Sequence, residues 1–209
     1  AAVLILDALR GRSPSPAQRE RGPGGEVLAA RSRLATHAPT LAACAILALV
    51  LASRWWAART LTVPLWGDSL QHTMIARLFD LQAGLPDDWR PLEPLSTFSY
   101  HFGLHAGVAA LASLADLSSH RALLVAGQVL QVLQVLTAYT LAAGLTGRRW
   151  AGVGAALAAG GLSPMPAYYL NWGRSTQLAA PVLLPAPLLA LTRAAAGAAD
   201  SRAARAPGA

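Results

Sequence analysis

This sequence of 209 residues is too apolar and too sparsely charged for a soluble globular domain. Hydrophobic residues make up 54% of the chain, charged residues make up 13%, and the mean hydropathy is +0.40. Soluble domains carry about 25% charged residues. The composition therefore excludes a water-exposed surface over most of the chain, and also disorder along its length, and it favours an integral membrane protein.

The net charge of +7 does not indicate a nucleic-acid partner. All 17 basic residues are arginines, and they cluster at the ends of apolar runs, as they do beside a membrane. The single cysteine, Cys44, lies inside an apolar run, so the sequence predicts neither a disulfide framework nor a thiolate metal site. The chain begins without Met and ends in a low-complexity stretch, and we expect a fragment of a longer multi-pass protein.

The first part of the chain predicts a loop followed by a membrane helix. Residues 1–9 are too short to span a bilayer, and we interpret them as the end of a preceding helix. Residues 10–37 hold six arginines among Pro, Gly and Ser, which indicates a cytoplasmic loop. An uncharged run follows and ends at Trp55 and Trp56. Tryptophan is typical of the membrane interface, so we expect a transmembrane helix over 38–57.

Residues 58–120 are expected to form an ordered loop on the outer side of the membrane. Their first part, 58–101, holds five acidic residues against three arginines, and four prolines break it into short pieces. Apolar residues recur at helical spacing between Asp68 and Ala83, which predicts an amphipathic helix on the membrane surface. The apolar run at 102–117 is short, so we expect a juxtamembrane helix that does not cross.

Three further membrane helices are expected within residues 121–196, before a low-complexity tail at 197–209. Glycine and alanine fill these runs, which permits close helix packing in lipid. The sequence thus predicts an all-α fold, a polytopic transmembrane helical bundle whose first outer loop contains an amphipathic helix. The uncharged stretches place the three helices at 121–146, 150–166 and 177–193.

The arginines decide the predicted topology, because positively charged loops stay on the cytoplasmic side. If 102–117 does not cross, the arginine-rich ends all lie inside, and residues 58–120 and 163–176 share the outer side. In the alternative topology 102–117 crosses, and Arg148 and Arg149 then lie outside.

The outer loop opens with Trp66-Gly-Asp-Ser-Leu-Gln-His72, which contains two candidates for catalysis. Asp68 and His72 are four residues apart and so share one face of a helix. A carboxylate at the membrane surface can act as the general base for an acceptor hydroxyl, or bind a divalent cation. The alternative is structural, since a carboxylate also favours the start of a helix.

A second motif, Tyr100-His-Phe-Gly-Leu-His105, again places two histidines four residues apart. His101 and His105 can ligate a metal through their ring nitrogens, and with Asp68 and His72 they make a ligand set for a divalent cation such as Mg²⁺ or Mn²⁺. They can instead contact a phosphate or a sugar. Histidine and tyrosine are also ordinary at the start of a membrane helix, so these alternatives stay open.

A third motif, Tyr168-Tyr-Leu-Asn-Trp-Gly-Arg-Ser-Thr-Gln177, places many hydrogen-bonding side chains between two apolar runs. Such a set is costly in a membrane unless it meets water or a ligand. Arg174 offers a planar fork for phosphate, Trp172 a face for a sugar ring, and Asn171 an amide. The alternative is an interfacial aromatic belt. Arg121 can pair with a lipid phosphate or simply anchor its helix end.

Four stretches taken together resemble the integral-membrane GT-C glycosyltransferases, most of all their bacterial branches. They are Trp66–His72, Phe98–Ala106, Gly147–Gly152 and Ser163–Gln177. The resemblance implies a polytopic helical fold in the bacterial inner membrane and the transfer of a sugar from a polyprenyl-phosphate donor to an acceptor at the outer face. It also gives Asp68 the role of the catalytic acidic residue and Arg121 that of contacting the lipid phosphate. This chain departs from better-known members in having Ser69 after Asp68, and His-Phe-Gly where several families have His-Pro-Pro.

We therefore expect a membrane glycosyltransferase acting on an envelope glycan, lipid or protein. Asp68 would activate the acceptor with help from His72, and the remaining candidates, His101, His105, Arg121, Asn171, Trp172 and Arg174, would contact the donor. No Walker loop, Rossmann fingerprint or His-Glu-x-x-His motif is present. The alternatives are a non-enzymatic transporter or flippase-like subunit, in which polar groups would lie at mid-membrane, and a scaffold subunit of an envelope polysaccharide system.

Overall fold

The computed structural model describes the backbone of residues 23–205 and the side chains of residues 35–198. All regular structure in these residues is helical, which confirms the all-α prediction for the described part of the chain. The expected end of a preceding helix at residues 1–9 lies outside it. The elements are α2 (Pro23–Ala58), α3 (Gly67–Leu81), α4 (Gly103–Ala115), α5 (Ser119–Thr146), α6 (Arg149–Leu157), the π-helix η2 (Ala158–Leu162), α7 (Ala167–Asn171), α8 (Ser175–Leu183) and α9 (Pro185–Arg205).

Three helical stretches are long and apolar enough to cross a membrane. They are Ala35–Ala58, Ser119–Thr146 and Ser175–Ala198, with 24, 28 and 24 residues. A spanning helix needs about 20 mostly apolar residues. These three membrane-length stretches overlap the helices predicted at 38–57, 121–146 and 177–193, and they indicate a membrane protein.

The helix expected at 150–166 is shorter in the structure. It consists of the nine residues of α6 and the five of η2, and it is not among the candidate spans. At 1.5 Å per residue it covers about 20 Å, less than the roughly 30 Å of a hydrocarbon core. Ser163 ends it in an extended conformation, because the residue before a proline, here Pro164, disfavours helix.

Both helices predicted within residues 58–120 form. α3 has 15 residues, and its Ile75 and Leu78 are fully buried, whereas its charged residues Arg77 and Asp80 are exposed. The amphipathic helix predicted between Asp68 and Ala83 is therefore present. α4 has only 13 residues, which is too short to cross a bilayer.

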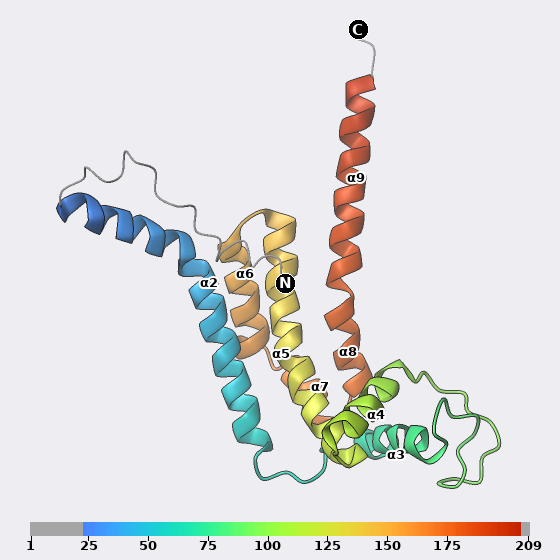
Figure 1. The fold of residues 1–209 in the computed structure, drawn as a ribbon. Coiled ribbons are helices and arrows are strands. Elements are labelled where there is room, and N and C mark those ends of the chain that lie inside the picture. The colour runs from blue at the N-terminus through green and yellow to red at the C-terminus, as the bar shows by residue number, and fades with distance from the viewer. Residues whose placement is uncertain (1–22, 206–209) are drawn as a thin grey trace.

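The ends of the described chain are more helical than expected. The predicted loop at 10–37 is helical from Pro23 onward, because α2 begins there. Proline suits the first position of a helix, and the Ala, Leu, Arg and Glu residues that follow are strong helix formers. α2 bends along its length, and it contains Pro39, which breaks the hydrogen-bond ladder (Figure 1). The expected low-complexity tail is helical as far as Arg205, since alanine dominates it.

α5 is the central helix and contacts every other described element. It packs against both α2 and α6 through a core of Val50, Val135 and Ala156. Gly152 on α6 makes this packing close: a Cβ added there would lie 2.8 Å from the backbone oxygen of Tyr139. Small residues thus bring helices together as the sequence predicted.

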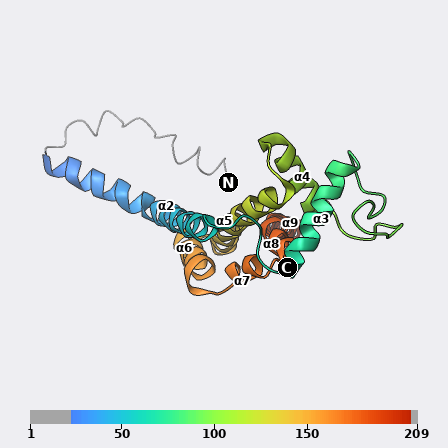
Figure 2. The ribbon, with the colours of Figure 1, turned by 90° about the horizontal axis from the view of Figure 1, so that it is seen from below.

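The connections between the long helices lie at two opposite ends of the bundle. α2 ends, and α5 and α8 begin, at the same end of the bundle, and α3 lies across that end with α4 beside it (Figures 1 and 2). The connection between α5 and α6, which holds Arg148, lies at the opposite end (Figure 1). This is the arrangement expected if 102–117 does not cross, and the side of the membrane on which each end lies stays a prediction.

The segment that follows α3 is ordered by Gln82. Its side-chain nitrogen donates to the backbone oxygens of Asp88 (3.1 Å) and Arg90 (2.9 Å), and its side-chain oxygen accepts from the backbone N–H of Asp87 (3.0 Å). Arg90 also forms an ion pair with Asp88, and the hydrogen bonds from Arg90 lower the pKa of the Asp88 carboxyl. These contacts agree with the prediction that the segment is ordered, while its place on the outer side stays a prediction.

Candidate functional site

Asp68 lies in the first turn of α3, at the end of the bundle where α2 ends and α5 and α8 begin. Trp66 precedes the helix with a positive φ of 68° and turns the chain into it. A carboxylate in the first turn is favoured by the helix dipole. The side chain of Asp68 is 50% exposed, so it is accessible to a substrate.

Arg174 is the partner of Asp68. Its Nε lies 3.1 Å from Oδ2 of Asp68, and its own side chain is 36% exposed. Arg174 immediately precedes α8, and its guanidinium carbon lies 4.4 Å from the ring centroid of Trp172. The ion pair and the aromatic face therefore hold the guanidinium at the start of a membrane-length stretch. The structure thus brings together two motifs that lie far apart in the sequence.

Gly173 makes this approach possible. Its φ is +72°, a conformation that side chains with a Cβ rarely adopt. A Cβ added at Gly173 would lie 2.6 Å from Oγ and 2.8 Å from N of Ser69, and 3.2 Å from the oxygen of Leu65. The chain before α8 thus sits directly on the start of α3, and only glycine fits there.

His72 and His105 join α3 to α4. Nδ1 of His72 lies 2.9 Å from Nε2 of His105, and the two side chains are 4% and 0% exposed. Burial lowers the pKa of His105 to about 4, helped by the nearby His72 and His101. Burial also lowers the pKa of His72, against the opposing effect of Asp68. Both rings are therefore neutral at pH 7, and neither faces solvent.

The remaining residues of the histidine motif surround this pair. The Tyr100 ring stacks on that of His101 with centroids 4.2 Å apart, and its edge meets the His105 ring at 5.8 Å. His101 itself is exposed. Among the predicted histidines, His101 is therefore the one that a substrate can reach directly.

Arg121 and Asn171 are both exposed. Within the described side chains, no hydrogen bond or ion pair joins either of them to Asp68 or Arg174. Arg121 lies in the first turn of α5, at the same end of the bundle (Figure 1). The predicted contact of Arg121 with a lipid phosphate stays a prediction.

The four residues predicted as metal ligands do not form a chelating cluster. Over residues 35–198, no group of three or more His, Cys, Asp and Glu side chains is placed to hold a metal ion. Nδ1 of His72 and Nε2 of His105 face each other, and the Asp68 carboxylate faces Arg174. In this conformation one ring nitrogen of each buried histidine and one oxygen of Asp68 are thus engaged with other groups.

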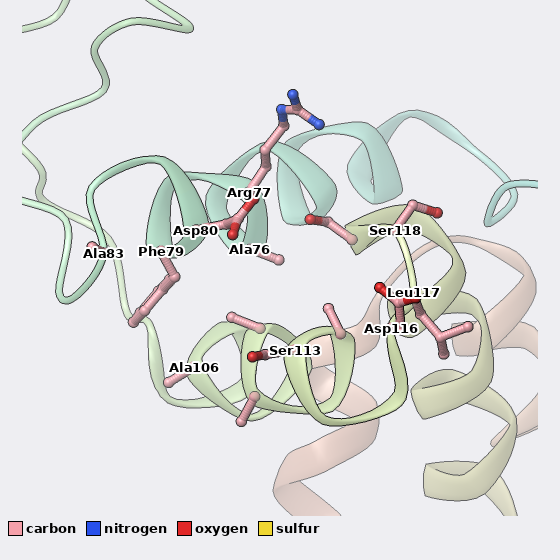
Figure 3. Close-up of a pocket in the computed structure, with 14 residues that line it drawn as sticks. Ala76, Arg77, Phe79, Asp80, Ala83, Ala106, Ser113, Asp116, Leu117 and Ser118 are labelled. Carbon is pink, nitrogen blue, oxygen red and sulfur yellow. The ribbon is translucent and has the colours of Figure 1, made fainter.

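A groove of about 700 Å³ lies between α3 and α4 (Figure 3). Alanines and serines form much of its lining, with Asp80 on one wall and Asp116 at the end of α4. Asp68 and the buried histidines do not line it. Sequence reasoning missed this groove, because helical spacing does not reveal how far apart two helices pack.

Sequence reasoning also missed a polar contact between two membrane-length stretches. Nη1 of Arg54 on α2 lies 3.4 Å from Oε1 of Gln131 on α5. The available signal was the recurrence of glutamine every third residue at 128, 131 and 134, which is unusual within an apolar run.

No protein-family model, no curated protein and no solved structure matches this chain. The geometry of the described residues is therefore what supports a function.

Proposed function

We propose that this chain is part of a membrane glycosyltransferase of GT-C type, which moves a sugar from a polyprenyl-phosphate donor to an acceptor at the outer face of a bacterial inner membrane. The observation that carries the proposal is the ion pair of Asp68 with Arg174. It joins an accessible carboxylate to an accessible guanidinium at the end of the bundle, where a lipid-linked phosphate would lie.

The two side chains have complementary tasks in this reaction. Asp68 accepts the proton of the acceptor hydroxyl, whose oxygen attacks the anomeric carbon of the sugar. The bond between that carbon and the phosphate oxygen breaks, and the polyprenyl phosphate leaves with the electron pair. Arg174 binds the phosphate, for which its planar fork is suited. Donor binding thus draws Arg174 away from Asp68 and frees the carboxylate to act as a base.

The other candidates have supporting positions. Trp172 stacks on Arg174 and orients it, while the exposed His101 and Arg121 lie at the same end of the bundle as Asp68. His72 and His105 are buried, so in this proposal they fix α3 against α4 and thereby position Asp68 without touching the substrate.

The test is sugar transfer by membranes that contain the full-length protein, given polyprenyl-phosphate-linked radiolabelled hexoses and pentoses. Asp68→Asn should abolish transfer. Asp80→Asn is the matched control, because Asp80 is exposed on the same helix and has no ion pair among the described residues. Undiminished transfer by Asp68→Asn, or equal loss in both variants, would refute the role of Asp68.

A non-enzymatic transporter is the second candidate, and one observation favours it. The contact of Arg54 with Gln131 places polar groups between two membrane-length stretches. Gln131 lies near the middle of α5, the depth at which a transporter would carry polar groups. In a transporter, Asp68→Asn would leave the protein's substrate flux intact and Gln131→Leu would reduce it, the reverse of the pattern expected for the enzyme.

A further inference from the structure

Arg54 is a charged side chain placed between two stretches that are long enough to cross a membrane. It lies on α2 within Ala35–Ala58, and its hydrogen-bond partner Gln131 lies on α5 within Ser119–Thr146. Gln131 is only 2% exposed. One turn further into the bundle, the apolar core of Val50 and Val135 closes the space between the two helices. The guanidinium is therefore enclosed on its inner side.

The charge of Arg54 has no counter-charge in the described structure. The three membrane-length stretches contain no Asp or Glu, and the ion pairs of residues 35–198 are Asp88 with Arg90 and Asp68 with Arg174. Nε of Arg54 is buried and has no hydrogen-bond partner. A guanidinium stays protonated, and here it is half-buried with Gln131 as a neutral partner for Nη1. An anion from outside the chain would supply the counter-charge and a partner for Nε.

The neighbouring residues indicate which anion reaches this depth. Trp55 and Trp56 directly follow Arg54 and are 72% and 66% exposed. Exposed tryptophans at the end of a spanning helix lie at the level of the lipid head groups. The guanidinium carbon of Arg59 lies 3.4 Å from the Trp56 ring centroid, which adds a second positive charge at that level. Arg54 thus lies within reach of lipid phosphates.

We propose that Arg54, oriented by Gln131, binds the phosphate of an anionic membrane phospholipid where α2 and α5 pack together. The planar guanidinium fork bonds phosphate oxygens in a bidentate manner, and Gln131 fixes the direction of the fork. The lipid supplies the missing negative charge, so its binding holds the two helices together. This site is independent of the proposed sugar transfer and does not include Asp68 or Arg174.

The experiment measures lipid binding by the full chain, purified in detergent and stripped of lipid. Bound lipid is counted by native mass spectrometry, and the thermal midpoint is followed with phosphatidylglycerol, with phosphatidylcholine and with inorganic phosphate. Wild type should bind phosphatidylglycerol and gain stability, while zwitterionic phosphatidylcholine and free phosphate should produce little change. Arg54→Gln should weaken phosphatidylglycerol binding at least about tenfold. Gln keeps a polar side chain opposite Gln131 and removes a half-buried charge that has no counter-charge among the described residues, so the variant should still fold.

Arg59→Gln is the matched control, because it removes the same charge from the exposed neighbourhood of the site and should change binding far less. Gln131→Leu keeps the charge but removes its hydrogen-bond partner, and it should produce a smaller loss than Arg54→Gln. Equal affinity of wild type and Arg54→Gln would overturn the proposal. Equal losses in Arg54→Gln and Arg59→Gln would also overturn it, since they indicate general surface attraction, and so would an equal gain in stability from inorganic phosphate.

Discussion

Nδ1 of His72 and Nε2 of His105 lie 2.9 Å apart in a buried contact that joins α3 to α4. One ring must donate a proton and the other must accept it, so the contact requires at least one neutral histidine. When both rings are charged, the contact becomes a repulsion. The packing of the two helices that cross the end of the bundle therefore depends on pH.

This contact predicts a loss of stability in mild acid. Burial lowers the pKa of His105 to about 4 in the folded protein, whereas the unfolded value is about 6.5. Between these values the unfolded chain binds more protons, so stability is present above pH 6.5 and falls as the pH falls toward 4. The burial-lowered pKa of His72 has the same sign. Thermal midpoints in detergent between pH 7.5 and 4.5 measure this fall.

The control for the pH effect is His105→Leu, which removes the titrating group while keeping an apolar body of similar size. This variant should have a lower midpoint at pH 7.5 and a weaker dependence on pH. A wild-type midpoint that stays constant from pH 7.5 to 4.5 would contradict the prediction.

Gly173→Ala should separate the start of α8 from the start of α3. The added Cβ would meet backbone and side-chain atoms of Ser69, and the positive φ adds strain, so we expect a loss of roughly 1–3 kcal/mol. Gly67→Ala is the control, because a Cβ there meets no atom within 4 Å. The measurement is the free energy of unfolding of each variant relative to wild type. Equal losses of stability in the two variants would contradict the close contact of Gly173 with Ser69.

Exchanging the charges of Asp68 and Arg174 separates structure from catalysis. The pair is partly exposed, so Asp68→Arg or Arg174→Asp alone should cost no more than about 1 kcal/mol of stability. The double variant restores the ion pair and should restore the thermal midpoint. Sugar transfer should be lost in both single variants and should remain lost in the double one, because the base and the phosphate ligand have changed places. Recovery of transfer by the double variant would refute the assigned roles.

Cysteine labelling tests the topology of the full-length protein in intact cells. Ser69 and Ser175 are each 3% exposed, so the reporters belong at exposed neighbours: Leu70, Gln177 and, at the other end, Arg148. With Cys44 replaced by alanine, a membrane-impermeant thiol reagent should label cysteines at 70 and 177 but not at 148. Labelling at 148 together with protection at 177 would mean that 102–117 crosses the membrane.

The sequence by itself determined where the long apolar helices lie, because bilayer thickness fixes the length of uncharged chain that a crossing requires. It also located the amphipathic helix α3, since helical periodicity is a local property. The predicted bounds of two helices were wrong. Residues 23–37 belong to α2 and not to a loop, and the proline-rich chain after Leu162 ends the helix expected at 150–166 early.

Only the tertiary structure decided which polar groups meet. The spacing of residues in the sequence placed Asp68 and His72 on one face of a helix. It gave no signal that Arg174 would form an ion pair with Asp68, or that His105 would contact His72. These pairings depend on the close approach of Gly173 to Ser69 and on the way α4 packs against α3. The contact of Arg54 with Gln131 likewise needs the antiparallel packing of α2 on α5. Periodicity indicates which face of a helix is polar, whereas the partner of that face is set by contacts between distant parts of the chain.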